Sequence, residues 1–246
     1  MKPLQLSILL ILFFGCTQPS IDFNIEPIPF LESQNSSLPR LFTDNTDNVF
    51  ISWVETVNNT STLFYSKLEN ENWLPKQKIA SSNSWFVNWA DFPSIIAHDG
   101  KVTTSHWLQK IEGGTYAYNV NIASSHNNWS TSINPHDDST ATEHGFVSMI
   151  PSSDSTFISI WLDGRNTQNH GSHDSHSSSE LSQAMTLRSA IIKNDLTILD
   201  EHLIDHNVCD CCGTSIAKTK NGIIAAYRDR TADEIRDISV ISFRNG

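Results

Sequence analysis

The sequence predicts an all-β fold of about four similar sheets, arranged as the blades of a propeller. The main observation is a degenerate repeat, in which residues 93–109 have relatives at residues 39–55, 147–163 and 214–230. Each copy has two short alternating segments around a turn rich in Asp, Asn or Gly, which is the pattern of a β-hairpin. Strand repeats with a period of about 50 residues are typical of propellers, because one small sheet cannot bury both of its faces alone.

Each hairpin ends on a large aromatic residue at the same place in the repeat. The first three are Trp53, Trp107 and Trp161, each 54 residues after the one before, and Tyr227 follows 66 residues later. The place of Tyr227 in the repeat predicts that it belongs to the core. No stretch after residue 30 shows a helical period over three turns, which supports the all-β class.

A third strand is expected in every unit after the loop that follows the aromatic residue. The four segments span residues 62–68, 117–123, 185–192 and 237–243. In the first two units the next turn closes on a tryptophan, at Trp73 and Trp129. Alternation of aromatic and β-branched residues between polar clusters predicts these strands.

The amino terminus is predicted to be a targeting segment, residues 1–16. Lys2 precedes an apolar run over residues 4–14, and Gly15 and Cys16 close it, which resembles a bacterial lipoprotein signal with Cys16 as the lipidated residue. An ordinary secretory peptide is the alternative. Either reading places the protein in the exported fraction, at the outer membrane or on the periplasmic side. Residues 17–37 are expected to form a tether with one added strand near residues 21–28, and residues 38–246 the propeller.

Composition limits the partners. The net charge of -11 argues against nucleic acid or an anionic membrane surface, so contact with a membrane is expected only through the lipid anchor. The charge does not exclude a small acidic ligand held by a local group of arginines. Apart from Cys16, three cysteines remain, and an odd number in an oxidising compartment indicates a disulfide with a leftover thiol, a metal site or an absent partner.

The long connections are expected at one end of the sheets. Strands in a blade are antiparallel, so the loops after second strands and after fourth strands emerge on the same side. These loops are residues 82–91, 134–145, 162–180, 205–213 and 228–237. Long loops on a rigid sheet scaffold are where binding residues concentrate, so we expect the ligand site there.

Four arginines on that side are candidate ligand-binding residues. They are Arg165, Arg228, Arg230 and Arg236, and each lies close in sequence to one of the carboxylates Asp163, Asp229, Glu234 and Asp237. A guanidinium group binds a carboxylate in a bidentate fork, so a glycan or small carboxylate is the expected ligand. The alternative is that these pairs only hold loops in place. Trp85 and Trp89 are expected to be exposed aromatic residues that contact a glycan.

Residues 209–240 together with residues 161–165 resemble exported bacterial sialidase-like propellers with BNR repeats. The resemblance implies a six-bladed propeller in which an arginine triad grips the substrate carboxylate, an aspartate is the acid and a tyrosine paired with glutamate is the nucleophile. On this basis Arg165, Arg228 and Arg236 would be the triad. Asp163, Asp229 and Glu234 would be the candidate catalytic residues of an exo-α-sialidase.

The sequence also departs from that family. Arg40 follows Pro39, which reverses the family order of arginine before proline, and no tyrosine and glutamate pair can be assigned. A non-catalytic propeller that binds a glycan or a protein is therefore the alternative to an enzyme. The fourth unit ends after its third strand, which predicts further blades beyond this sequence; closure with four blades is the other possibility.

Cys209, Cys211 and Cys212, with His206 nearby, predict either a disulfide or a metal site. Thiolate and imidazole ligands suit zinc or copper, although no cofactor is required by the rest of the sequence. His170, His173 and His176 stand in a Ser-rich insert that reads as a low-complexity loop with at most weak metal affinity.

Overall fold

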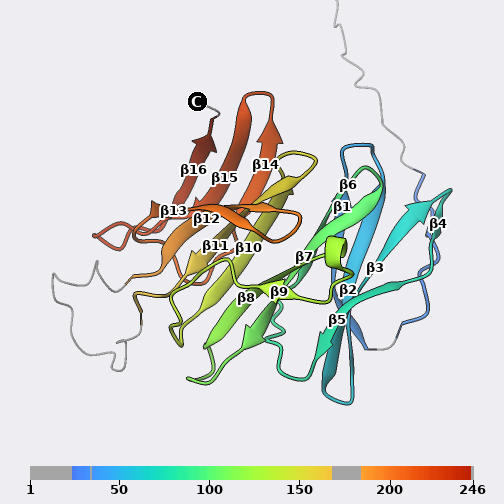
Figure 1. The fold of residues 1–246 in the computed structure, drawn as a ribbon, viewed down its shortest axis with the longest axis horizontal. Helices are drawn as coiled ribbons and strands as arrows, with labels where there is room; N and C mark the ends of the chain where they lie inside the picture. Colours follow the sequence, from blue (N-terminus) through green and yellow to red (C-terminus); the bar gives the residue numbers. More distant parts are fainter. Residues whose placement is uncertain (1–23, 34, 168–183, 245–246) are drawn as a thin grey trace, which may run out of the picture.

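The computed structural model describes residues 24–33, 35–167 and 184–244, and these form four antiparallel sheets (Figure 1). Sheet 1 contains β1 (Ser36–Thr43), β2 (Val49–Val57), β3 (Thr60–Glu69) and β5 (Gln77–Ser82), with the short β4 (Asn72–Trp73) paired to the end of β3. Sheet 2 contains β6 (Ser94–His98), β7 (Lys101–Lys110), β8 (Tyr118–Ser124) and β9 (Ser132–Ile133). Sheet 3 contains β10 (His144–Pro151), β11 (Thr156–Asp163), β12 (Thr186–Lys193) and β13 (Ile198–Asp205). Sheet 4 contains β14 (Ser215–Thr219), β15 (Gly222–Arg228) and β16 (Ile238–Phe243).

The all-β prediction is confirmed. Every hairpin of the repeat is present, and the expected third strands coincide with β3, β8, β12 and β16. In the described residues the only helical element is the short 3-10 turn η1 (Ser125–Asn127), and no helix is long and apolar enough to cross a membrane.

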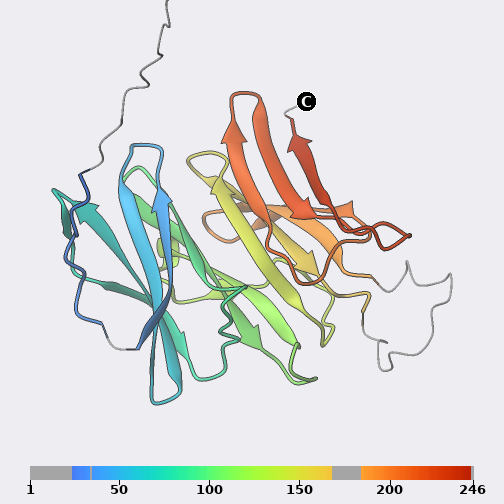
Figure 2. The same cartoon turned by 180° about the vertical axis from the view of Figure 1, so that it is seen from behind.

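The sheets follow one another in chain order, with sheet 1 and sheet 4 at opposite ends of the row (Figures 1 and 2). Their first strands are neighbours in space, because β1 contacts β6, β6 contacts β10 and β10 contacts β14. The described sheets therefore pack like successive blades, but they form an open row and not a closed ring. The number of blades and the sialidase type stay predictions.

The core consists of three apolar clusters, one between each pair of neighbouring sheets. Strand β11 shows how one sheet serves two of them. Phe157 and Trp161 point into the cluster shared with sheet 2, while Ile160 and Leu162 point into the cluster shared with sheet 4. Side chains alternate between the two faces of a strand, so a strand such as β11, with apolar residues on both faces, is buried on both sides.

The aromatic residues of the repeat, Trp53, Trp107, Trp161 and Tyr227, are all buried, as predicted. Trp53 lies on the outer face of sheet 1 and is covered by Phe30, with ring centroids 5.1 Å apart. The segment that carries Phe30 forms no strand over residues 24–33, so the expected strand over residues 21–28 is wrong in its described part. Pro27 and Pro29 lack the N–H groups that a strand needs for pairing.

Candidate functional site

The long connections meet at one end of the sheets, as the topology predicted. Isolated bridges join Trp85 to Gln109, Tyr118 to Glu143 and Val208 to Asp229. We call this end the loop face; its described connections are residues 83–93, 111–117, 134–143, 164–167, 206–214 and 229–237.

A small cavity lies where the first strands of the four sheets begin. Its volume is about 190 Å³, and its lining comes from β1, from β10 and from the segments that lead into β6 and β14. The lining residues are Arg40, Ala90, Asp91, Phe92, Phe146, Val147, Gly213 and Thr214. We call it the inner cavity. Arg40 and Thr214, more than 170 positions apart in the sequence, both line it. They meet because the first strands of the sheets are neighbours in space.

Arg40 is the cationic group of the inner cavity. It lies at a bulge, where the pairing of β1 with β2 shifts register between Ser37 and Arg40. Its side chain is accessible to solvent, and within the described residues it makes no ion pair or hydrogen bond. The surrounding protein displaces water from the guanidinium group and lowers its pKa. A cation without a protein partner in a recess favours an anionic ligand.

Asp91 is the acidic group of the same cavity. It is only 4 % exposed, and its Oδ2 accepts a hydrogen bond from the backbone N–H of Phe146 at 2.7 Å. Burial raises the pKa of Asp91 to about 7, against the opposing effect of that hydrogen bond, and the negative charge of Glu143 raises it further. Asp91 is therefore protonated in about half of the molecules at neutral pH, unlike an ordinary aspartate.

Glu143 and Tyr118 form a hydrogen-bonded pair that the sequence analysis did not single out. The Tyr118 hydroxyl donates to Oε1 of Glu143 at 2.5 Å, and the Tyr118 ring is buried against Phe86 at a centroid distance of 4.2 Å. Burial also raises the pKa of Glu143. Because burial raises the pKa of Tyr118 as well, the hydroxyl stays protonated and acts as a donor that holds Glu143.

Gly145 allows these acidic groups to approach one another. A Cβ at this position would stand 2.0 Å from Oδ2 of Asp91 and 3.0 Å from Cε2 of Tyr118. Such distances exclude a side chain, so the glycine fixes the close approach of the Asp91 carboxyl group to the β10 backbone.

Arg165 belongs to a different group of residues. Its Nε and Nη2 donate to the two carboxylate oxygens of Asp163, each at 2.8 Å, and Nη2 also donates to Glu201 at 2.9 Å. Asp163 is fully buried, and Trp161 Nε1 donates to it as well, at 2.9 Å. Burial would raise the pKa of Asp163, but the bonds from Arg165 and the nearby His144 lower it. With its donors satisfied by carboxylates, Arg165 anchors the connection after β11.

Two histidines extend this group, and sequence reasoning did not single them out. His136 Nδ1 and His144 Nε2 each lie 3.1 Å from Oδ2 of Asp138, with the two rings stacked 3.9 Å apart. Burial, together with the neighbouring His144, lowers the pKa of His136 to about 4. The three side chains could hold a cation, but Arg165 Nε already lies 3.5 Å from the same Asp138 oxygen. In the sequence, the only sign of this group is that His136, Asp138 and His144 stand in one long connection, residues 134–145.

The other three predicted arginines lie at the end of β15, in the case of Arg228, and on the connection to β16, in the case of Arg230 and Arg236. Both Arg230 and Arg236 form ion pairs with Glu234. Nη2 of Arg230 lies 2.6 Å from Oε1 of Glu234, and Nη2 of Arg236 lies 3.2 Å from Oε2. Arg228 Nη1 lies 3.4 Å from Sγ of Cys212, and its Nε donates to the carbonyl oxygen of Arg236 at 3.3 Å. No hydrogen bond or ion pair within the described residues joins Arg165 to this set.

The predicted acidic residues on this connection are also engaged. Glu234 is held by the two arginines, and Asp229 accepts hydrogen bonds from the Arg230 N–H at 2.7 Å and from the Ser239 hydroxyl at 3.2 Å. No hydrogen bond joins either carboxylate to Asp91 in the described part of the chain.

The two tryptophans that were expected to be exposed differ in burial. The expectation for Trp85 is wrong, because its side chain is buried. The Trp85 backbone pairs with Gln109, and its ring stacks on Trp107 with the ring centroids 5.5 Å apart. Trp89 is 84 % exposed on the segment that leads to Asp91, as expected.

Cys209, Cys211 and Cys212 bring their sulfur atoms together, whereas His206 is exposed and outside that group. Cys16, His170, His173 and His176 lie outside the described residues.

No family model matches this chain, and no curated protein matches it. Among solved structures, a thermostable family-43 glycoside hydrolase is similar with 10% identity and a TM-score of 0.46, over 84% of this chain and 68% of that one. The polysaccharide lyase Uly1 is similar with 9% identity and a TM-score of 0.31, over 84% of this chain and 57% of that one. Both likenesses are too weak to assign a fold family or a function.

Proposed function

We propose that this protein binds an acidic sugar, or another small carboxylate ligand, in the inner cavity. The observation that carries the proposal is Arg40, a guanidinium group that lines the cavity and has no acidic partner among the described residues. Arg165, Arg230 and Arg236 are paired with carboxylates of the protein, so each would have to give up an ion pair to bind a ligand. Arg40 loses no ion pair within the described residues when it binds one.

The size and lining of the cavity support a small ligand. Pockets for drug-sized molecules have volumes of about 300–1,000 Å³. The inner cavity, at about 190 Å³, suits one terminal sugar or a small carboxylate. The exposed Trp89, one residue before Ala90 of the lining, offers an aromatic face to the remainder of a glycan.

The chemistry that Asp91 can supply is proton donation to a leaving oxygen. Cleavage of a glycosidic bond requires one carboxyl group that is protonated and one that is ionised. Asp91, with its pKa raised to about 7 by burial, would be the acid, and Glu143, held by Tyr118, would be the second carboxyl group. A propeller that binds the glycan without cleaving it would need Arg40 but not this pair.

A ligand panel tests the proposal. Purified protein is titrated with N-acetylneuraminate, glucuronate and the methyl ester of each, and hydrolysis of the matching fluorogenic glycosides is measured. We expect one free acid to bind at least about tenfold more tightly than its ester, because the ester cannot form the charge-assisted bonds to Arg40. Equal binding of acid and ester, or no binding of any of them, would contradict it.

We further propose that the protein is exported and anchored by a lipid on Cys16. The support is the sequence of residues 1–16 alone. Replacement of Cys16 by Ser should move the protein from the membrane fraction to the soluble exported fraction, and unchanged fractionation would refute the anchor.

A further inference from the structure

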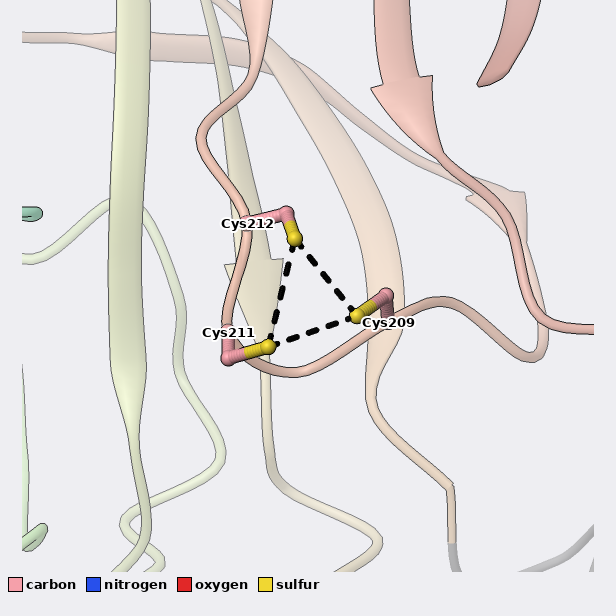
Figure 3. Close-up of side chains that lie close together, drawn as sticks. All are labelled: Cys209, Cys211 and Cys212. Carbon is pink, nitrogen blue, oxygen red and sulfur yellow. Dashed lines mark hydrogen bonds between the residues drawn. The ribbon is translucent and has the colours of Figure 1, made fainter. Parts of the chain in front are cut away.

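We propose that Cys209, Cys211 and Cys212 bind one thiophilic metal ion of the Zn²⁺ or Cu⁺ class. The three sulfur atoms point toward one another across the turn before β14 (Figure 3). This site is separate from the carboxylate ligand proposed for the inner cavity, and it rests on different residues.

The spacing of the sulfur atoms fits a single ion. The Sγ atom of Cys209 is 3.5 Å from that of Cys211 and 3.7 Å from that of Cys212, and the last two are 3.9 Å apart. Zinc binds thiolates at about 2.3 Å with tetrahedral angles, which sets its sulfur ligands about 3.8 Å apart. An ion can therefore contact all three sulfurs with little movement of the chain. A disulfide would need two of them at about 2.05 Å.

Backbone contacts hold the start of this turn in place. The bridge of Val208 to Asp229 pairs the start of the segment with the end of β15, and the Cys209 N–H donates to the Arg228 carbonyl oxygen at 2.9 Å. Cys209 is buried, so of the three cysteines it is the one that the surrounding protein holds most firmly. The chain then turns at Asp210 and returns Cys211 and Cys212 toward it.

A guanidinium group lies beside the three sulfur atoms. Arg228 Nη1 lies 3.4 Å from Sγ of Cys212 and 3.9 Å from Sγ of Cys209. Three thiolates with a divalent ion carry one net negative charge, which a single guanidinium group balances. On this proposal Arg228 would be a partner of the metal site, instead of the sugar carboxylate expected from the sequence.

The chemistry of the three ligands indicates which ions bind, and the exposure of Cys211 indicates how an ion enters. Within the described residues only sulfur ligands converge here, and soft thiolates select Zn²⁺ and Cu⁺ over Mg²⁺ or Ca²⁺. Cys211 is exposed, so an ion can enter from solvent on that side. Three ligands complete the coordination of Cu⁺, whereas Zn²⁺ would take a water molecule or another ligand as its fourth.

Metal titration of the full chain tests the site. Protein purified with a reductant and without metal is titrated with Co²⁺, whose thiolate complexes absorb in the near ultraviolet, and Zn²⁺ or Cu⁺ is then added in competition. We expect one ion per chain, and native mass spectrometry identifies whether Zn²⁺ or Cu⁺ displaces Co²⁺. Absence of the thiolate-to-cobalt absorption, together with no Zn²⁺ or Cu⁺ bound in native mass spectrometry, would overturn the proposal.

Variants separate the site from accidental binding. Cys211→Ser, at an exposed position, should lower Zn²⁺ or Cu⁺ affinity by at least about 100-fold, more than the loss of an outer partner costs. Cys209→Ser should do the same, and Cys16→Ser is the matched control that keeps all three sulfurs. Circular dichroism shows whether each variant is folded; Cys211→Ser stays informative if Cys209→Ser is not. Equal affinity in Cys211→Ser and Cys16→Ser, or a disulfide that forms in the presence of equimolar metal, would refute the site.

Discussion

The Tyr118 hydroxyl donates a hydrogen bond to Oε1 of Glu143 and so joins the start of β8 to the connection that enters β10. The backbone bridge between the same two residues reinforces this contact. Asp91, from the connection between sheets 1 and 2, accepts a hydrogen bond from the Phe146 N–H of β10 and lies on the same side of Gly145 as the Tyr118 ring. Three sheets thus contribute to one small acidic group, whose geometry depends on the packing of sheet against sheet.

Tyr118→Phe should destabilise the protein by about 1–3 kcal/mol, because Glu143 loses its hydroxyl donor while staying partly buried. Denaturation with guanidinium chloride measures the change in unfolding free energy. The matched control is Tyr116→Phe, since Tyr116 is 62 % exposed and should cost little. Equal losses in the two variants would show that the Glu143 contact contributes nothing.

The stability of the wild-type protein should decrease relative to Asp91→Asn as pH rises from about 4 to 7. Burial raises the folded-state pKa of Asp91 to about 7, above the unfolded value of about 3.9. A carboxyl group with a raised folded pKa favours folding at low pH, and this contribution is lost as pH rises through the folded pKa. The asparagine variant has no proton to lose.

The difference between Asp91→Asn and wild type is expected to change by on the order of 3 kcal/mol across that range. Urea denaturation at four or five pH values measures it. A difference that does not depend on pH would mean that the Asp91 carboxyl group titrates normally in the folded protein.

Arg165→Ala should destabilise the fold by about 3–5 kcal/mol, because it leaves the buried Asp163 carboxylate without its guanidinium partner. Arg230→Ala removes an arginine of the same face whose partner, Glu234, is largely exposed, and should cost at most about 1 kcal/mol. Thermal unfolding of the two variants side by side tests the contrast. Similar melting temperatures would favour a ligand-binding role for Arg165 over a structural one.

The repeat made most of the fold predictable. Alternation within each copy defined the hairpins, and the aromatic positions identified the core, because both depend on local sequence. The repeat even extends to a detail of the site: Trp53 Nε1 donates to Glu55 and Trp161 Nε1 donates to Asp163, in both cases two residues along the strand. The cation that pairs with this carboxylate differs: it is Lys76 for Glu55 in sheet 1 and Arg165 for Asp163 in sheet 3.

The candidate site was less predictable, because it is formed by contacts between sheets. Tyr118 and Glu143 are 25 residues apart, and nothing in their local sequence pairs them. The order of Pro39 and Arg40 does not fit the family pattern, so the sequence gives no reason to place Arg40 in a site; its position in the inner cavity depends on the bulge in β1. Trp85 stands in a polar connection, and only its pairing with Gln109 turns the ring into the core.

The most direct test of the proposed function is the affinity of Arg40→Ala for the acidic sugar that the wild type binds, measured by isothermal titration calorimetry. We predict a loss of about 10- to 100-fold, which corresponds to one or two charge-assisted hydrogen bonds, with little change in melting temperature. Arg230→Ala, the control arginine on the loop face, should bind as the wild type does. Unchanged affinity in Arg40→Ala, or an equal loss in Arg230→Ala, would contradict the assignment of Arg40 as the anchor of the ligand.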